Sequence, residues 1–407
     1  MADRAGAVRV AVFRAARPTR LTVCSAALLC LLVAAAPAAA RTLEEALVST
    51  FPGALRADGE GLATVFRRTV PASFPVTGAS SSYAYRFDPA TDSFQRLSIP
   101  LGPVFSERAE TLGARKLSVG INYLLVRYDT IDDRDLDNLV SNDPTKAGDH
   151  VAICTGPPNK PGVVCEPVAA AARVDLEAQM VTLSATYGVT PELDVNVFLP
   201  VVRTFVRSST SFLGPDPRAP QMSGYFPFYY AARTSETATG LGDLLLRAKY
   251  LLARSAPVHL AAGLTLSLPT GNPANFQGTG DTLLGTALYA SQTYAERVEP
   301  HVNLGFVLDT RTLDRSQVRY SAGADVRVFD WLTVNNDFLG SSDVAQPGAI
   351  PHPVFVQLDR ADVFQWSTGL KVAPWRRLVG FFNALLPLNR DGLRADVVLT
   401  FGIEWVF

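Results

Sequence analysis

The chain has 407 residues, with 37 Lys or Arg against 38 Asp or Glu, so its formal net charge is −1. This near balance excludes the strongly basic surface that a nucleic-acid-binding protein needs. The mean hydropathy of +0.14 is high for a soluble protein and low for a bundle of membrane helices. An intermediate value is typical of a membrane barrel, in which only alternate residues face lipid.

Residues 1–40 are predicted to be a signal peptide. Arginines recur up to Arg20, an apolar run extends from Leu21 to Ala36, and Ala38 to Ala40 offer an A-x-A cleavage site. The alternative is an N-terminal membrane anchor, for which the run is short. Because no other segment approaches 18 uninterrupted apolar residues, a chain that crosses a membrane would do so with strands.

Residues 41–114 lack the long strand pattern of the rest of the chain. Leu43 to Leu55 predicts a short amphipathic helix. Tyr83–Phe87 and Phe94–Ile99 predict a hairpin around the Pro- and Asp-containing turn between them. Two interpretations of this region are open: a periplasmic linker, or a plug that folds into the mouth of a barrel.

From residue 115 onward, apolar and polar residues alternate with a period of two, which is typical of strands. In one clear case Val318, Tyr320 and Ala322 oppose Arg319 and Ser321. Twelve strands are predicted, at 115–128, 173–187, 192–206, 241–253, 258–270, 281–295, 300–310, 317–329, 331–341, 360–373, 376–388 and 393–407.

The connections between these strands alternate in length. Tight turns alternate with longer loops at 129–172, 207–240, 271–280 and 342–359. With an even number of strands, this alternation places both termini on the periplasmic side and the long loops outside. The predicted fold is therefore all-β: a transmembrane antiparallel up-and-down β-barrel of about 12 strands over 115–407, preceded by the periplasmic or plug segment.

The closing stretch, Leu393 to Phe407, carries the strongest pattern. Its alternate positions are apolar or aromatic and include Phe401, Ile403, Trp405 and Phe407. The alternative is the last strand of a soluble sandwich, which needs only about five or six such residues. The stretch resembles the closing strand of bacterial outer-membrane barrels, and this resemblance implies that the barrel-assembly machinery recognises it.

If the apolar residues face lipid, the remaining side chains line the lumen. Both signs of charge occur there in similar numbers, so strong selection for anions or cations is not expected. Buried charges need partners or water, so the lumen is either open or filled by paired side chains. The predicted lumen-lining residues are Lys116, Asp194, Asn196, Asp243, Arg247, Lys249, His301, Asn303, Asp309, Arg319, Asp325, Arg327, Asp337, Lys371, Arg394, Asp396 and Glu404.

Cysteine and histidine usage bears on catalysis and metal binding. Cys154 and Cys165 share a Pro- and Gly-rich loop, and in an oxidising compartment a disulfide between them is expected. A metal site, helped by His150, is the alternative, but no metal and no cofactor is predicted. A barrel hydrolase would need a Ser beside a His. Neither His259 nor His301 is followed by Ser at the second position, so no catalytic residue and no enzyme activity is predicted.

Three runs of sequence carry a family resemblance: Tyr187 to Val202, Gly240 to Leu252 and Gly263 to Pro273. The stretch YAYRFDPATDSF, followed by GPVFSERAETLG, adds to it. Together they resemble the bacterial family "putative MetA-pathway of phenol degradation", whose members are often described as transporters. The resemblance covers most of residues 80–407 and implies a barrel in the outer membrane of a Gram-negative-type bacterium, reached after signal-peptide export.

Two hypotheses of function follow. The first is an outer-membrane channel for passive uptake of small aromatic or hydrophobic molecules, with the lipid bilayer, the barrel-assembly machinery and small solutes as partners and no nucleic acid. The second is a closed structural or interaction barrel that acts through external loops such as 129–172 and 207–240. Phenolic cargo rests on the family association alone.

Overall fold

The structure is a computed structural model in which residues Ala39–Phe407 form one compact unit. The residues it describes are 41–51, 56–78, 81–88, 90, 93–139, 151–154, 165–215, 227–254, 258–345, 361–375 and 377–407. The predicted signal peptide, residues 1–40, lies outside this described part.

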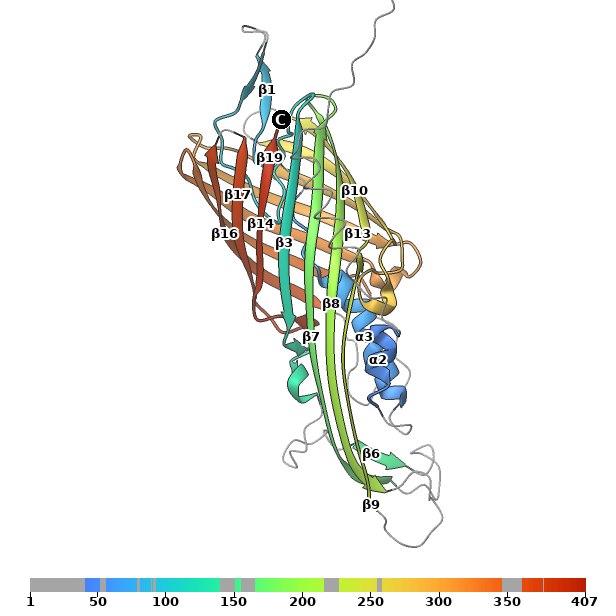
Figure 1. Cartoon of the computed structure of the whole chain (residues 1–407). Helices are drawn as coiled ribbons and strands as arrows, with labels where there is room; N and C mark the ends of the chain where they lie inside the picture. The colour runs from blue at the N-terminus through green and yellow to red at the C-terminus, as the bar shows by residue number, and fades with distance from the viewer. Residues whose placement is uncertain are drawn as a thin grey trace, which may run out of the picture. The chain divides into compact units, whose positions relative to one another are not determined.

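Twelve of the described strands close into an antiparallel barrel, which confirms the predicted fold class (Figure 1). In chain order they are β3 (Leu117–Tyr128), β7 (Cys165–Gly188), β8 (Leu193–Pro215), β10 (Leu244–Ala253), β11 (His259–Leu268), β12 (Leu283–Ser291), β13 (Val298–Asp309), β14 (Gln317–Phe329), β15 (Leu332–Asp343), β16 (Asp362–Trp375), β17 (Leu378–Pro387) and β19 (Val398–Val406). Each pairs with its neighbour along the chain, and β19 pairs with β3 to close the wall.

The other elements lie at the two ends of this wall. They are the helices α2 (Leu43–Val48) and α3 (Arg56–Ser73), the 3-10 turns η2 (Leu136–Asn138), η3 (Pro273–Asn275) and η4 (Leu313–Arg315), and the short strands β1 (Tyr85–Asp88), β2 (Ser93–Arg96), β4 (Thr130–Ile131), β5 (Arg134–Asp135), β6 (Val151–Cys154) and β18 (Leu393–Arg394), together with β9 (Pro227–Leu241). We call the end of the barrel where β19 finishes the C-terminal rim. The hairpin of β1 and β2 projects from that rim, as Figure 1 shows.

The opposite end carries a long three-stranded arm, formed by β7, β8 and β9 (Figure 1). β9 continues the line of β10: residues 201–215 of β8 pair with β9, and residues 193–198 pair with β10. The predictions of loops at 129–172 and 207–240 are wrong where these strands run. Strand stretches rich in Ser, Thr and Ala lack the apolar alternation of a lipid-facing wall, so the sequence pattern ended at the membrane segment.

The outer face of the wall is apolar and the inner face is polar. In β19, Phe401, Ile403 and Trp405 are exposed on the outside, whereas Thr400 is fully buried on the inside. Successive residues of a strand point to opposite faces, so one sequence period produces both surfaces. A closed sheet also leaves no unpaired edge, which is what hydrocarbon surroundings demand.

No helix in the described part of the chain has the length and the apolar run needed to cross a bilayer.

The two helices pack on the arm side of the barrel. Thr42 caps α2 and forms a reciprocal capping box with Glu45. α2 contacts β8, β9 and η3, and α3 contacts η3 and β18. The single helix predicted at 43–55 is therefore shorter, and α3 was not predicted because two glycines and Pro71 interrupt its pattern. The hairpin predicted after it is confirmed by the pairing of β1 with β2.

Truncation of Phe66 is expected to release α3 from the barrel. The Phe66 side chain is fully buried and packs edge-on against Phe276, with 6.1 Å between ring centroids. Phe66→Ala should cost about 3–5 kcal/mol of docking free energy because it leaves a cavity. Limited proteolysis measures the release of α3, because cleavage within residues 56–73 should become faster in the Phe66→Ala variant. Leu313→Ala, at a residue 69% exposed, is the control, and equal cleavage of both variants would contradict the packing described.

Candidate functional site

The lumen contains part of the N-terminal region. We call the described residues of 74–84, together with residues 97–113, the inner segment; its two runs are tied to each other where Gly78 N–H donates to the carbonyl of Val104 at 2.7 Å. The described residues of the inner segment do not pair with the strands of the barrel wall. Most of their backbone N–H and C=O groups therefore need side-chain partners. Inward-facing residues of the wall supply those partners, and they come from strands all round the barrel.

Glu404 holds the inner segment near the C-terminal rim. Its carboxylate accepts hydrogen bonds from the backbone N–H of Ser82 at 3.0 and 3.1 Å and from the hydroxyls of Ser81 and Ser82. Ser118 of β3 donates to the same carboxylate at 2.6 Å. One charged group of β19 is thus surrounded by donors from two parts of the chain, the arrangement that makes a buried carboxylate tolerable.

Lys371 of β16 makes the cationic counterpart of this contact. Its ammonium donates to the carbonyls of Leu101 at 3.2 Å and Pro103 at 2.8 Å, and to the hydroxyl of Ser82 at 3.2 Å. These partners use all three ammonium protons. Lys371 therefore joins the two runs of the inner segment to the wall.

Asn303 and Arg108 tie the middle of the inner segment to β13. Asn303 exchanges two hydrogen bonds with the backbone of Glu107, each 2.8 Å long. The guanidinium of Arg108 lies 3.6 Å from the carboxylate of Glu299, with both side chains 1% exposed, and donates to the carbonyls of Pro100 and Ser81. Charge pairing so far from water fixes the path of the segment.

Further wall residues complete the attachment. Lys249 donates to the carbonyls of Arg108 and Glu110 at 3.3 and 2.9 Å, and Asp194 accepts from the backbone N–H of Leu112 at 2.8 Å. Behind the inner segment, the side chains of His301 and Asp337 are fully buried, with 2.5 Å between His301 Nε2 and Asp337 Oδ1. The half of the lumen next to the C-terminal rim is consequently filled.

Glu110 carries an ion-pair cluster of its own. His259 Nδ1 lies 2.8 Å, Arg86 3.2 Å and Arg254 3.7 Å from its carboxylate. Burial acts to raise the pKa of Glu110, but the hydrogen bond and charge of His259, with the charges of Arg254 and Arg86, outweigh it and hold this pKa below its ordinary value. The charged form of Glu110 therefore stabilises the inner segment.

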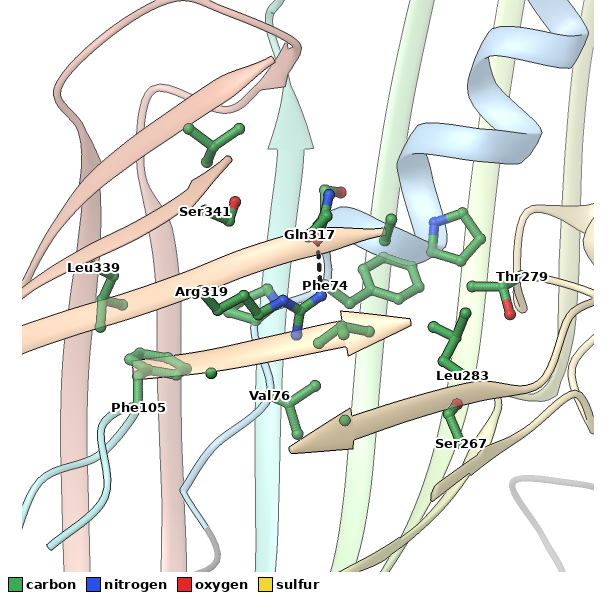
Figure 2. A pocket seen from close by; sticks show the side chains of 18 of the residues that line it. Phe74, Val76, Phe105, Ser267, Thr279, Leu283, Gln317, Arg319, Leu339 and Ser341 are labelled. Carbon is green, nitrogen blue, oxygen red and sulfur yellow. Dashed lines mark hydrogen bonds between the residues drawn. The ribbon is translucent and has the colours of Figure 1, made fainter. Parts of the chain in front are cut away.

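The other half of the lumen, toward the arm, contains a cavity of about 510 Å³. Figure 2 shows Phe74, Val76 and Phe105 of the N-terminal region among its lining side chains, together with Leu283 and Leu339 of the wall. Its volume falls within the range of small-molecule sites, about 300–1,000 Å³. The residues present fit an apolar ligand, and the filled half of the lumen closes the cavity toward the C-terminal rim.

Most of the predicted lumen-lining residues point inward. Those that hydrogen-bond to the inner segment are Asp194, Arg247, Lys249, Asn303, Arg327, Lys371 and Glu404. His301, Asp325 and Asp337 form the buried cluster behind it, and Asn196 donates to Thr186 of the wall. Arg319 and Arg394 border the cavity.

Five predicted residues lie at the ends of the barrel. Asp243 and Asp309 accept backbone N–H groups of the arm-side loops, and Arg327 lies at the C-terminal rim beside Glu296. Lys116 and Asp396 precede β3 and β19, and the ammonium of Lys116 lies over the ring of Tyr85, 4.7 Å from its centroid. Asp396 is exposed in the turn before β19.

The sequence analysis missed the charges that the inner segment contributes. Glu107, Arg108 and Glu110 all lie in the run GPVFSERAETLG, which was assigned to the linker or plug region and to the family resemblance, with no role given to its charges. Three charges within a stretch that has no strand period and is bounded by glycines were the available signal. Glu299 was missed because the predicted strand began one residue later, at Pro300.

The described residues hold no group of three His, Cys, Asp or Glu side chains arranged to bind a metal ion. β6 pairs with β7 so that Cys154 is opposite Cys165 in the register. The side chains of both cysteines lie outside the described part of the structure, so the disulfide stays a prediction.

Comparison with known proteins gives a family match over residues 155–372, to the family described as "Putative MetA-pathway of phenol degradation". No curated protein matches the sequence. Among solved structures, an outer membrane channel from Pseudomonas putida F1 is similar, with 15% identity and a TM-score of 0.46, covering 74% of this chain and 99% of that one. The Ralstonia pickettii toluene transporter TbuX has 12% identity and a TM-score of 0.35, covering 72% and 90%.

Replacement of Lys371 by Met is expected to loosen the inner segment. The variant keeps the side-chain volume but leaves the carbonyls of Leu101 and Pro103 without their donor, at about 1–3 kcal/mol for each buried acceptor. Hydrogen exchange of residues 97–113 should become faster. Lys116→Met, at the rim, is the matched control, and unchanged exchange in Lys371→Met would show that this lysine does not hold the segment.

The Glu110 cluster predicts a dependence on pH. A carboxylate with a lowered folded-state pKa contributes stability that is present above its unfolded pKa, near 4.5, and is lost as pH falls through the folded value. The wild-type melting temperature should therefore fall more than that of Glu110→Gln between pH 6 and pH 3. Glu60→Gln, at an exposed position of α3, is the control. Equal falls in wild type and Glu110→Gln would contradict the cluster's role.

Proposed function

The chain belongs to the family described as "Putative MetA-pathway of phenol degradation", and from this premise we propose that it is an outer-membrane channel for passive uptake of small aromatic or hydrophobic molecules. The observation that carries the proposal is the cavity of about 510 Å³ inside a closed barrel, lined by Phe74, Phe105 and Leu339. An apolar solute gains free energy on leaving water for such a site.

The proposal includes an orientation. The C-terminal rim faces the periplasm and the arm faces outward, because the closing strand ends at that rim and the long connections lie at the other end. The apolar outer face, with Phe401 and Ile403 about half exposed, then meets the lipid bilayer. Residues 1–40 serve as the export signal, and Phe401, Ile403, Trp405 and Phe407 engage the barrel-assembly machinery.

Two further parts of the proposal concern the arm and the chemistry. A disulfide joins Cys154 to Cys165, supported by their opposed positions in the register of β6 and β7. The channel moves solutes without chemical change. Both ring nitrogens of the buried His301 are bonded, Nδ1 to the carbonyl of Glu299 and Nε2 to the carboxylate of Asp337, so neither is left to activate a hydroxyl nucleophile.

Transport also requires a path past the inner segment. We propose that this segment is a plug: a solute waits in the cavity and passes to the periplasm when the bonds made by Lys371 and Glu404 open. These polar contacts are numerous but individually modest, so local opening without unfolding of the barrel is expected.

The second candidate function, a closed barrel that acts through its external parts, is favoured by one observation: the arm extends beyond the other strands (Figure 1) and carries exposed charged side chains such as the pair Arg207 and Asp175. In that case shortening the arm would abolish partner binding and leave solute uptake at the level of empty liposomes throughout.

A reversible lock tests the channel and its plug together. The hydroxyl oxygens of Ser106 in the inner segment and Ser321 in β14 are 3.1 Å apart, so Ser106→Cys with Ser321→Cys should form a disulfide that ties the plug to the wall. Oxidation should abolish uptake of a small phenol into liposomes, and a reductant should restore it.

The single variant Ser321→Cys, which keeps the native cysteines, is the control and should respond to neither reagent. Uptake that is equal in the locked and reduced double variant would show that the plug need not move. Absence of uptake in every variant, including wild type, would contradict the channel itself.

A further inference from the structure

We propose that the cavity selects apolar molecules that carry an anionic head group, a carboxylate above all, and that Arg319 receives this group. The inference rests on the proposed transport function and narrows its substrate class.

Arg319 borders the cavity and has no carboxylate partner among the described residues, as is also true of Arg68 and Arg394. Within the described residues the one hydrogen bond of Arg319 goes from its Nη2 to the side-chain oxygen of Gln317, at 3.2 Å, as Figure 2 shows. Gln317 in turn donates to Asp343 at 2.9 Å, so an amide separates the guanidinium from the nearest acid along this chain of bonds. A guanidinium has five N–H donors, and most of those of Arg319 remain available to a ligand.

Three of the other cations around the cavity are engaged. Arg394 is one of them, donating to the carbonyl of Phe364 and the side chain of Asn389. Arg68, the fourth, is only partly exposed. Arg247 lies 3.7 Å from the carboxylate of Glu107 and over the ring of Phe198, and Arg315 pairs with Asp281 at 2.9 Å. Arg319 differs from them in being exposed to the cavity. A cation in a poorly solvated place is unfavourable without a counter-charge, and a bound anion would supply it.

The wall beside Arg319 leaves room for a ligand. Its neighbours in the register are Gly305 on one side and Ser341 on the other, and Gly305 is followed by Ala287. None of these side chains reaches far into the lumen. Leu339, Phe74 and Phe105 provide the apolar surface (Figure 2).

This arrangement has the two parts that an amphipathic anion needs. The planar fork of an arginine matches a carboxylate with two parallel hydrogen bonds, which a neutral alcohol cannot reproduce. Aromatic and aliphatic side chains cover the body of the molecule without fixing its identity. The cavity should therefore discriminate by the head group more strongly than by the shape of the apolar part.

The test compares two probes of one skeleton, 4-phenylbutanoate and 4-phenylbutan-1-ol, at pH 7.5. Calorimetric titration of the refolded full-length mature protein should show the carboxylate binding at least about tenfold more tightly. Arg319→Gln should remove this preference by weakening the carboxylate and leave the alcohol unchanged. Arg319→Lys should retain part of it, since an ammonium keeps the charge but loses the fork.

Arg311→Gln, at an exposed arginine of an arm-side turn, is the matched control and should behave as wild type. Heat-dependent gel mobility verifies that each variant is folded. If the alcohol binds as well as the carboxylate to wild type, or if Arg319→Gln keeps the preference, the proposed head-group site is wrong while the channel stands. If neither probe binds and neither enters liposomes, the channel proposal fails as well.

Discussion

The structure depends on the hydrogen-bonding demand of an irregular chain inside a closed barrel. The described part of the inner segment pairs with no strand of the wall, so its buried N–H and C=O groups must find side chains or, as at Gly78 and Val104, each other. Asn303, Lys371 and Glu404 meet that demand from three different strands. The charged side chains of the lumen therefore lie where the backbone of the inner segment needs a hydrogen-bond partner.

The same demand explains why the lumen carries both signs of charge. A carboxylate such as Glu404 accepts from N–H and hydroxyl groups, whereas an ammonium such as Lys371 donates to carbonyls. An irregular chain presents donors and acceptors in turn, so the wall must present acceptors and donors in turn. On the arm side of the lumen, where small residues such as Gly305 line the wall, a cavity remains beside Phe74 and Phe105 of the inner segment. The lumen thus has a half filled by the inner segment and a half that can hold a ligand.

The sequence predicted the wall much better than its contents. The strand expected at 317–329 is Gln317–Phe329 in the structure, because a period of two with one face toward lipid is a strong local signal. The inward direction of Arg247 and Asn303 followed from the same period. Their partners could not be predicted, since a hydrogen bond between residues about two hundred positions apart depends on the three-dimensional path of the N-terminal region. The arm was not predicted for a different reason. β7 and β8 continue past the lipid-facing segment, and in these continuations apolar residues no longer occupy every second position.

The most direct test of the account is permeation of liposomes by phenol and by a neutral sugar, through the refolded mature protein and through the same protein without residues 41–110. Folding of both is verified by heat-dependent gel mobility. If the N-terminal region is a plug in a channel, its removal should increase the permeation of both solutes well above that of the full-length protein. A folded barrel that stays impermeable to both solutes after the deletion would contradict the account, and would leave a closed barrel that acts through its external arm.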